Sequence, residues 1–374
     1  MSARAVQLGE VCEFVYGDSL KEEHRRPGKV PVFGSNGIVG WHDQAITSGP
    51  TIVIGRKGSI GEINWSSKPC YPIDTTYFVE KTKQPCDLRW LYFTLLKLDL
   101  TRLNKSAAIP GLNREDAYEQ RIPWPNLSEQ KRITGLLEQA DRLRRTCRYA
   151  LDLSESFLPA AFLELFGDPV RNEKGWNIAR LEDACSESNG IKAGPFGSSL
   201  KKDSYSNSGI RVYGQEQVIA GDFSIGDYYI SKSTFGDFAA YEVKPGDVLI
   251  SLVGTFGRVV VVPDGVRRGI INPRLLKISP KSAVLDSTFL AKFIEHPMTQ
   301  HELMRMSHGG TMGILNAGLL RKLRIILPPL RDQRQFATLV ERHEDLKARQ
   351  REALRQGDHL FQSVLHCAFS PAET

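Results

Sequence analysis

Several features are scarce in this chain of 374 residues, and each absence excludes a class of protein. The cysteines are scattered and never form a Cys-x-x-Cys pair, which disfavours a zinc site or a disulfide framework and suits a reducing cytosol. No apolar run approaches the roughly 20 residues that span a bilayer. Residues 1–7 lack the apolar core of a signal peptide. We therefore expect a cytoplasmic protein that does not enter a membrane.

Enzyme signatures are also missing. No Gly-x-x-x-x-Gly-Lys-Ser/Thr phosphate loop occurs, and Gly55, Gly58 and Gly61 have the wrong spacing for a dinucleotide-binding turn. The Asn/Asp-Pro-Pro-aromatic turn of an amino-methyltransferase is absent, because residues 272–274 and 327–330 do not match it. We therefore assign no catalytic, cofactor-binding or metal-binding residue.

One string of residues leaves an enzymatic alternative open. Asp237, Glu242 and Lys244 have the residue types of a nuclease site, although the continuation through residues 245–247 indicates a turn before a strand. The alternative hypothesis is therefore a self-contained DNA-cleaving enzyme with its site near these residues.

The composition that is present belongs to an ordinary globular protein, with 41% hydrophobic and 25% charged residues. The length predicts two or more domains. The formal net charge of +6 favours a polyanionic partner, but only weakly, because many proteins without a nucleic-acid role have a similar charge.

The most informative feature is an internal repeat. Residues 127–131 reappear as residues 330–334, a shift of 203 positions, and the match continues without a gap for about forty residues. Upstream, Leu112 and Asn113 fall on Leu315 and Asn316 at the same shift. A duplication of this size predicts approximate two-fold symmetry and two equivalent working surfaces.

The repeat divides the chain into four segments. Residues 1–126 form a first domain with many short strands and a helix over 88–98, and residues 169–328 repeat its plan with different polar residues. Residues 127–168 and 329–370 are predicted to be long helices. The fold class is therefore α/β (mixed α+β), with two domains and two long helices.

Both helices carry an apolar stripe with steps of three and four residues, which is typical of helices packed on helices. Ser128 is a plausible start of the first helix, and Pro159 is expected to kink or break it. Packing only within their own domains is the alternative. The stripe residues predicted to pack or to bind a partner are Ile133, Leu137, Leu143, Leu151 and Leu158 in the first helix, and Phe336, Val340, Leu346, Leu354 and Phe361 in the second.

Two antiparallel helices of this length, roughly 58 Å at ~1.5 Å per residue, would hold two unlike domains at a fixed separation. DNA is the most economical target for such a molecule. Polar residues on predicted turns are the candidate DNA contacts, because they suit phosphates and base edges. They are Ser35, Asn36, Arg56, Lys57, Ser59, Lys105 and Asn113 in the first domain, and Lys192, Gln215, Glu216, Thr255, Arg258, Arg274, His308, Thr311 and Asn316 in the second.

The chain resembles the specificity subunit of type I restriction-modification systems over nearly its whole length. The resemblance rests on ordered motifs in both halves. These are residues 55–61, 74–77, 107–113 and 123–130 in the first half, and residues 245–248, 254–257, 314–316 and 328–333 in the second. The second half departs from the pattern at residues 251–253, and residues 271–274 stand where the first half has Asp-Thr-Thr-Tyr.

The resemblance implies two target-recognition domains, separated by a coiled-coil spacer, that each recognise one half of a bipartite double-stranded DNA site. It also implies that the spacer helices bind two modification subunits, which carry S-adenosylmethionine and methylate adenine. Restriction subunits would add ATP- and Mg-dependent cleavage. The chain itself would have no catalytic site and no cofactor. A helical scaffold that binds only proteins is a third hypothesis.

Overall fold

The computed structural model describes residues 4–103, 111–186, 190–195, 200, 205–252, 258–307 and 316–369. The chain forms two compact units, the first made of residues 1–150 and 350–374 and the second of residues 151–349. Two long helices, α4 (Leu127–Phe166) and α10 (Leu330–Phe369), contribute to both units. Within the described part of the chain, no helix has both the length and the apolar character needed to cross a membrane.

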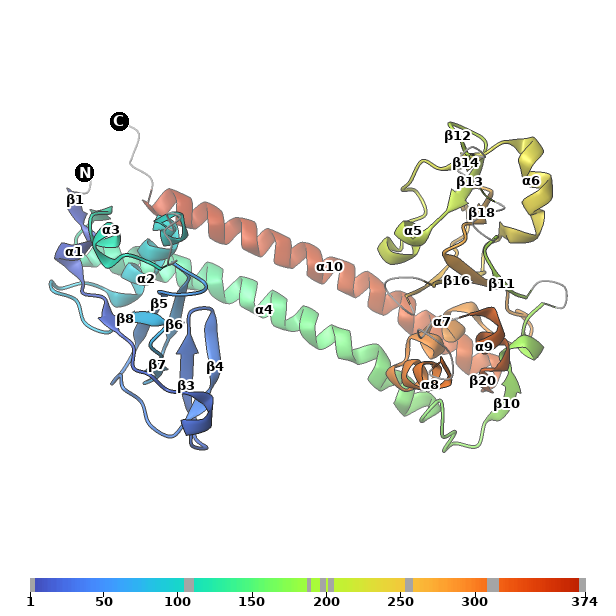
Figure 1. The fold of residues 1–374 in the computed structure, drawn as a ribbon, viewed down its shortest axis with the longest axis horizontal. Helices are drawn as coiled ribbons and strands as arrows, with labels where there is room; N and C mark the ends of the chain where they lie inside the picture. The colour runs from blue at the N-terminus through green and yellow to red at the C-terminus, as the bar shows by residue number, and fades with distance from the viewer. Residues whose placement is uncertain are drawn as a thin grey trace. The chain divides into compact units, whose positions relative to one another are not determined.

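The first unit is built on an antiparallel sheet of order β2-β8-β5-β6 and a smaller sheet of order β4-β3-β7, in which β3 and β7 run parallel (Figure 1). A further pair joins β1 to β9. The strands are β1 (Arg4–Gln7), β2 (Val15–Tyr16), β3 (Val30–Gly34), β4 (Gly37–His42), β5 (Thr51–Gly55), β6 (Ile63–Ser66), β7 (Tyr71–Pro72), β8 (Thr76–Val79) and β9 (Arg121–Trp124), and the shorter helices are α1 (Leu8–Val11), α2 (Leu88–Leu98) and α3 (Arg114–Tyr118).

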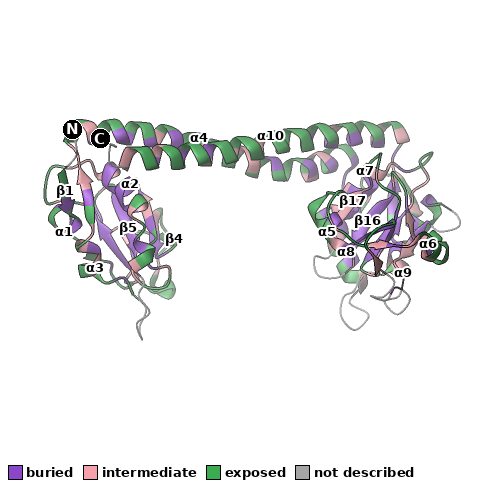
Figure 2. Ribbon diagram, turned by 90° about the horizontal axis from the view of Figure 1, so that it is seen from above, coloured by how far each residue is buried: buried purple, intermediate pink, exposed green. Residues whose placement is uncertain are grey.

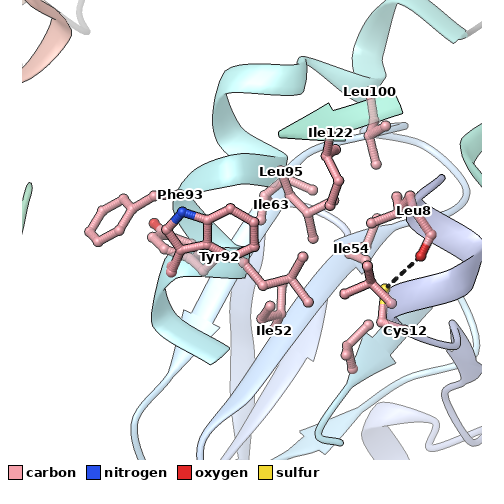
Figure 3. Packing of buried hydrophobic residues seen from close by; sticks show 14 of the residues in the cluster. Leu8, Cys12, Ile52, Ile54, Ile63, Tyr92, Phe93, Leu95, Leu100 and Ile122 are labelled. Atoms are coloured by element: carbon pink, nitrogen blue, oxygen red, sulfur yellow. Dashed lines mark hydrogen bonds between the residues drawn. The ribbon is translucent and has the colours of Figure 1, made fainter. Parts of the chain in front are cut away.

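Strand β5 lies at the centre of this unit, and every one of its residues is buried. Ile52 and Ile54 belong to the main core beside Leu95 and Ile122 (Figure 3), whereas Val53 belongs to a separate cluster. This division follows the alternation of side chains along a strand. Each fully buried large apolar side chain contributes about 1.5–3 kcal/mol, so covering both faces fixes the position of the strand and of the loop that follows it.

The second unit has sheets of order β11-β19-β16-β17 and β12-β14-β13-β18-β15, together with the pair β10-β20. Its strands are β10 (Asn177–Arg180), β11 (Ile191–Ala193), β12 (Tyr205–Ser206), β13 (Ile210–Tyr213), β14 (Tyr229–Ile230), β15 (Glu242–Val243), β16 (Val248–Ser251), β17 (Val259–Val261), β18 (Gly269–Ile271), β19 (Leu275–Ile278) and β20 (Arg324–Leu327). The shorter helices are α5 (Gln215–Ala220), α6 (Lys232–Phe238), α7 (Ser287–Glu295), α8 (Pro297–Ser307) and α9 (Ala317–Lys322).

The two domains share one topology. The sheet β2-β8-β5-β6 corresponds strand by strand to β11-β19-β16-β17, and the parallel pair β3-β7 corresponds to β13-β18. The pair β1-β9 likewise corresponds to β10-β20. The duplication and the mixed α/β class predicted from the sequence are therefore confirmed.

Backbone hydrogen bonds correct one detail of the sequence alignment between the halves. The amide of Arg56 donates to the carbonyl of Thr75, and the amide of Leu252 donates to the carbonyl of Arg274, both at 2.9 Å. Arg274 therefore corresponds to Thr75, and residues 273–276 occupy the place of residues 74–77. The expected match of residues 271–274 was two positions off, because the loops before this point differ in length.

Helices α4 and α10 are 40 residues long and begin 203 positions apart. The cap of α4 is Asn126, whose side chain accepts a hydrogen bond of 2.9 Å from the amide of Glu129, so the predicted start at Ser128 was slightly late. Pro159 lies inside α4 without breaking it. The neighbouring Leu158 and Phe162 are buried in the core of the second unit, and this packing outweighs the lost hydrogen bond.

The two helices pack antiparallel within the second unit. His343 lies 2.9 Å from the carbonyl oxygen of Ser154, and the ring of Phe336 contacts that of Phe162 at 5.5 Å between centroids. Residue numbers rise along α4 as they fall along α10, which defines the antiparallel direction. An ion pair of 3.6 Å joins Lys347 to Glu155.

The first unit contains the symmetry-related contact. Arg144 lies 3.8 Å from Asp358, and a shift of 203 converts this pair into Lys347 and Glu155. The guanidinium of Arg144 also lies 3.9 Å from the ring centroid of Phe361. A Cβ on Gly357 would lie 3.3 Å from the Arg144 backbone, so the helices approach closely here. The same shift of 203 thus relates the sequences and the contacts of the two helices.

Candidate nucleic-acid interface

A glycine-rich loop follows β5 and presents polar residues of the first domain. A Cβ on Gly55 would lie 1.9 Å from the carbonyl oxygen of Ser59, and one on Gly61 would lie 2.4 Å from the backbone of Leu100. Gly61 also has a φ of +77°, which favours glycine. These glycines allow a tight turn in which Lys57 is exposed and Ser59 is half-buried.

Ser35 holds this loop against its neighbours. Its hydroxyl donates hydrogen bonds to the carbonyl oxygens of Lys57 and Thr75, the latter at 2.9 Å, and the residue is only 9% exposed. The next residue, Asn36, is exposed in the turn between β3 and β4. The structure therefore brings Ser35, Asn36, Arg56, Lys57 and Ser59 together, with Ser35 bonded to backbone groups and the others toward the surface.

Two residues that the sequence analysis missed complete this surface. The ring of Tyr16, which is 50% exposed, lies 5.2 Å from the guanidinium of Arg56 and 5.4 Å from that of Arg114. Tyr77 supports Tyr16 at 5.0 Å between ring centroids, and burial raises its pKa to about 12. Each cation–π contact contributes about 0.5–1 kcal/mol at an exposed site. No sequence motif could have identified Tyr16 and Arg114. Strand pairing brings Tyr16 to Arg56, and Arg114 follows Leu112, whose amide donates a hydrogen bond to the carbonyl of Arg56.

Asn113 and Asn316 occupy equivalent positions and have equivalent structural roles. The side-chain oxygen of Asn113 accepts from the amide of Glu115 at 2.9 Å, and that of Asn316 accepts from the amide of Leu319 at 3.0 Å. Both asparagines therefore cap a short helix. The other candidates Lys105, Thr255, His308 and Thr311 lie outside the described residues.

Four candidates of the second domain gather at strand ends. The carbonyls of exposed Arg258 and Arg274 accept hydrogen bonds from the amides of Ser251, which ends β16, and Leu252, which follows it. Gln215 and Glu216 begin α5 after β13. The end of β18 lies beside the end of β13, since the amide of Asn272 donates a hydrogen bond of 2.8 Å to the carbonyl of Tyr213.

Lys192 occupies a different place from those four residues. It lies in β11, in register with Lys277 of β19, and its ammonium lies 4.6 Å from the ring centroid of Tyr241. The structure therefore does not place Lys192 at the strand ends that carry Gln215, Glu216, Arg258 and Arg274.

The predicted stripe residues of the long helices divide by burial. Six are buried within the two units, namely Ile133, Leu137, Leu158, Phe336, Val340 and Phe361. Leu151 and Leu354 are half-buried. Leu143 and Leu346, which correspond to each other in the repeat, are 49% and 50% exposed. Exposed residues cover much of both helices (Figure 2), so the two equivalent leucines remain available to a partner.

The structure gives the nuclease-like string ordinary structural roles. Asp237 is exposed in α6, and the carboxylate of Glu242 accepts a hydrogen bond of 2.6 Å from the guanidinium of Arg268. The amide of Lys244 donates to Asp247, whose buried carboxyl also pairs with Lys277 and has a pKa raised by burial. Among the described residues, no group of three His, Cys, Asp or Glu side chains is placed to hold a metal ion.

Comparisons with known proteins agree on one family. The family described as "Type I restriction modification DNA specificity domain" matches residues 4–147 and 173–356. The EcoBI specificity subunit of Escherichia coli is 21% identical, covering 85% of this chain and 72% of its own. The MjaVIII specificity subunit of Methanocaldococcus jannaschii is also 21% identical, and the match covers 82% of this chain and 75% of that subunit. The crystal structure of a specificity subunit from M. genitalium covers 99% of this chain and 96% of its own with a TM-score of 0.64 and 16% identity.

Proposed function

Because the chain belongs to the type I restriction-modification DNA specificity family and has two target-recognition domains, we propose that each domain recognises one half of a bipartite DNA site. The observation that carries this proposal is the unequal chemistry at equivalent strand ends. Arg56 and Thr75 of the first domain correspond to Leu252 and Arg274 of the second. One topology with different polar residues suits two different half-sites.

The chain is the non-catalytic member of this system, and the chemistry belongs to partner subunits. We propose that two modification subunits bind it, each carrying S-adenosylmethionine and methylating adenine, and that restriction subunits supply cleavage driven by ATP and Mg²⁺. The assembly would act in the cytoplasm, where it meets double-stranded DNA.

The long helices offer two equivalent apolar surfaces for the modification subunits. Leu143 of the first unit and Leu346 of the second are related by the repeat and are 49% and 50% exposed. Phe157 and Leu360 form a second related pair, 45% and 46% exposed. Equal exposure of large apolar residues at symmetry-related positions is the pattern expected of a surface used twice.

Light scattering of the chain mixed with its cognate modification subunit tests this stoichiometry. We expect two copies per chain, one copy for Leu143→Asp or Leu346→Asp, and none for the double variant. Ile219→Asp changes an apolar residue that is 44% exposed in α5, so it serves as the matched control and should still bind two copies. A single copy on the unchanged chain would refute the proposed stoichiometry.

DNA methylation tests the recognition proposal. The chain and the modification subunit together should methylate DNA at particular sites, whereas the chain alone should neither methylate nor cleave DNA with Mg²⁺ present. Cleavage by the chain alone, abolished by Asp237→Ala, would instead support the enzymatic alternative.

A further inference from the structure

Arg56 and Arg114 approach the same aromatic ring from different elements of the first domain. Arg56 follows β5, and Arg114 begins α3 directly after the cap Asn113. Hydrogen bonds fix the backbone of both segments. The amide of Leu112 donates a bond of 2.9 Å to the carbonyl of Arg56, and the hydroxyl of Tyr77 donates one of 3.2 Å to the carbonyl of Leu112. The two guanidinium groups are therefore held by a rigid frame.

Acidic side chains do little to neutralise these two cations. Where the structure describes the chain, no carboxylate oxygen lies within 4.0 Å of the Arg56 guanidinium. This group instead donates a hydrogen bond of 2.6 Å to the backbone carbonyl oxygen of Asp74. Among the residues that the structure describes, Arg114 pairs only with Glu115, at 4.0 Å, and that side chain is 71% exposed. Like charges near one ring repel each other, so this arrangement is suited to an anionic or acceptor-rich ligand.

The position of Arg56 depends on aromatic contacts more than on hydrogen bonds. Its Nε is buried without a hydrogen-bond partner among the described residues, and its guanidinium lies over the rings of Tyr16 and Tyr77 at 5.2 and 5.8 Å. Tyr16 is thus an exposed side chain that contacts both arginines. Loss of its ring would remove an aromatic contact from each guanidinium group.

We propose that Arg56 and Arg114 form a two-guanidinium site for acceptor atoms of DNA in the first half-site, and that Tyr16 is its positioning residue. This inference rests on the proposed function. Arginine binds paired acceptors, either O6 and N7 of guanine or two oxygens of a phosphate. Leu252 occupies the place of Arg56 in the second domain, so the site serves one half-site only.

The test measures binding by the complex of the chain and its modification subunit. Three duplexes are needed: one with the mapped site, one with the first half-site replaced, and one of unrelated sequence, each at several salt concentrations. The variants are Arg56→Lys, Arg56→Gln, Arg114→Lys, Arg114→Gln, Tyr16→Ala and Tyr16→Phe. The controls Arg102→Lys and Arg102→Gln change an exposed arginine of the same unit that pairs with Asp99.

The results distinguish the two sources of acceptor atoms. Contact with guanine predicts that Arg56→Lys weakens binding to the mapped site alone, by about 5- to 150-fold. Contact with phosphate predicts that Arg56→Gln, which removes the charge, weakens binding equally on all duplexes and makes the salt slope smaller by about one. Arg56→Lys keeps the charge and should then retain most of the binding. Tyr16→Ala should act like the arginine variants, and Tyr16→Phe should restore binding because it keeps the ring.

Two negative outcomes have different meanings. If the unchanged complex shows no preference for the mapped site, the proposed function fails. If that preference is present but the Lys and Gln variants of Arg56 and Arg114 all bind like the matching variants of Arg102, only the two-guanidinium site is overturned. If Tyr16→Ala binds like the unchanged complex while the arginine variants are weakened, the positioning role of Tyr16 is wrong. Circular dichroism of each variant establishes that it is folded before binding is compared.

Discussion

Gln130→Leu should destabilise the first unit because this side chain ties α4 to the domain. Gln130 is 1% exposed. Its side-chain oxygen accepts a hydrogen bond of 2.9 Å from the amide of Asp87, and its side-chain nitrogen donates one of 3.0 Å to the carbonyl of Pro125. Asp87 in turn caps α2 through the amide of Trp90. Leucine has a similar size but cannot replace either bond, so two shielded backbone groups lose their partners. At about 1–3 kcal/mol each, we expect a loss of roughly 2–6 kcal/mol.

Tryptophan fluorescence can follow this unit separately. Trp41, Trp65, Trp90 and Trp124 lie in the first unit, and Trp176 lies in the second. In a Trp176→Phe background, urea unfolding monitored by fluorescence therefore reports the first unit. With a slope of about 2–3 kcal/mol per molar urea, the midpoint should fall by about 0.7–3 M.

Gln139→Leu is the matched control, because Gln139 is exposed on the same helix. Surface substitutions usually change stability by no more than about 0.5 kcal/mol. If Gln130→Leu and Gln139→Leu unfold at the same urea concentration, Gln130 does not hold the helix to its domain and the reasoning is refuted.

Three further predictions follow from other parts of the structure. Gly61→Ala should lower the urea midpoint of the same fluorescence transition, by an amount equivalent to at least about 1 kcal/mol. The added Cβ would meet the backbone of Leu100, and position 61 has a positive φ that alanine rarely adopts. An unchanged midpoint would contradict the tight turn. Burial lowers the pKa of His296, so its neutral form stabilises the second unit above the ordinary pKa of about 6.5 and this stability is lost as pH falls below it. His296→Phe should reduce the loss of thermal stability between pH 7 and pH 5, and an identical loss would disprove that role. A permutant with residue 369 joined to residue 1 and opened near residue 170 should fold and bind its partners. The reason is that the ring of Trp90 contacts the rings of both Phe369 and Trp124, and Trp124 pairs with Arg4 between β9 and β1. Loss of both folding and partner binding would count against the described packing.

The repeat made much of the fold predictable. Periodic apolar residues determine long helices locally, and a constant shift of 203 required the second half to copy the first. Leu143 and Leu346 even retain equal exposure. Local signals were less reliable where tertiary packing competes with propensity. Pro159 remains inside α4 because Leu158 and Phe162 are buried beside it.

The candidate interface was only partly predictable. The Gly55–Gly61 loop was visible because glycine spacing is a local signal, and it carries Arg56 and Lys57. Tyr16 and Arg114 gave no such signal, since only tertiary contacts between segments distant in the sequence bring them to the site of Arg56. Asn113 also shows that a polar residue beside a turn can serve the backbone, because its side-chain oxygen caps α3.

The central claim is that two unlike domains together specify one bipartite DNA site. The direct measurement is to map modified adenines in DNA from a host without adenine methylation that expresses the modification subunit with and without this chain. We predict modification that requires the chain and falls at one motif with two short specified parts separated by an unspecified gap. Modification at a single continuous motif, or the same pattern without the chain, would contradict the claim.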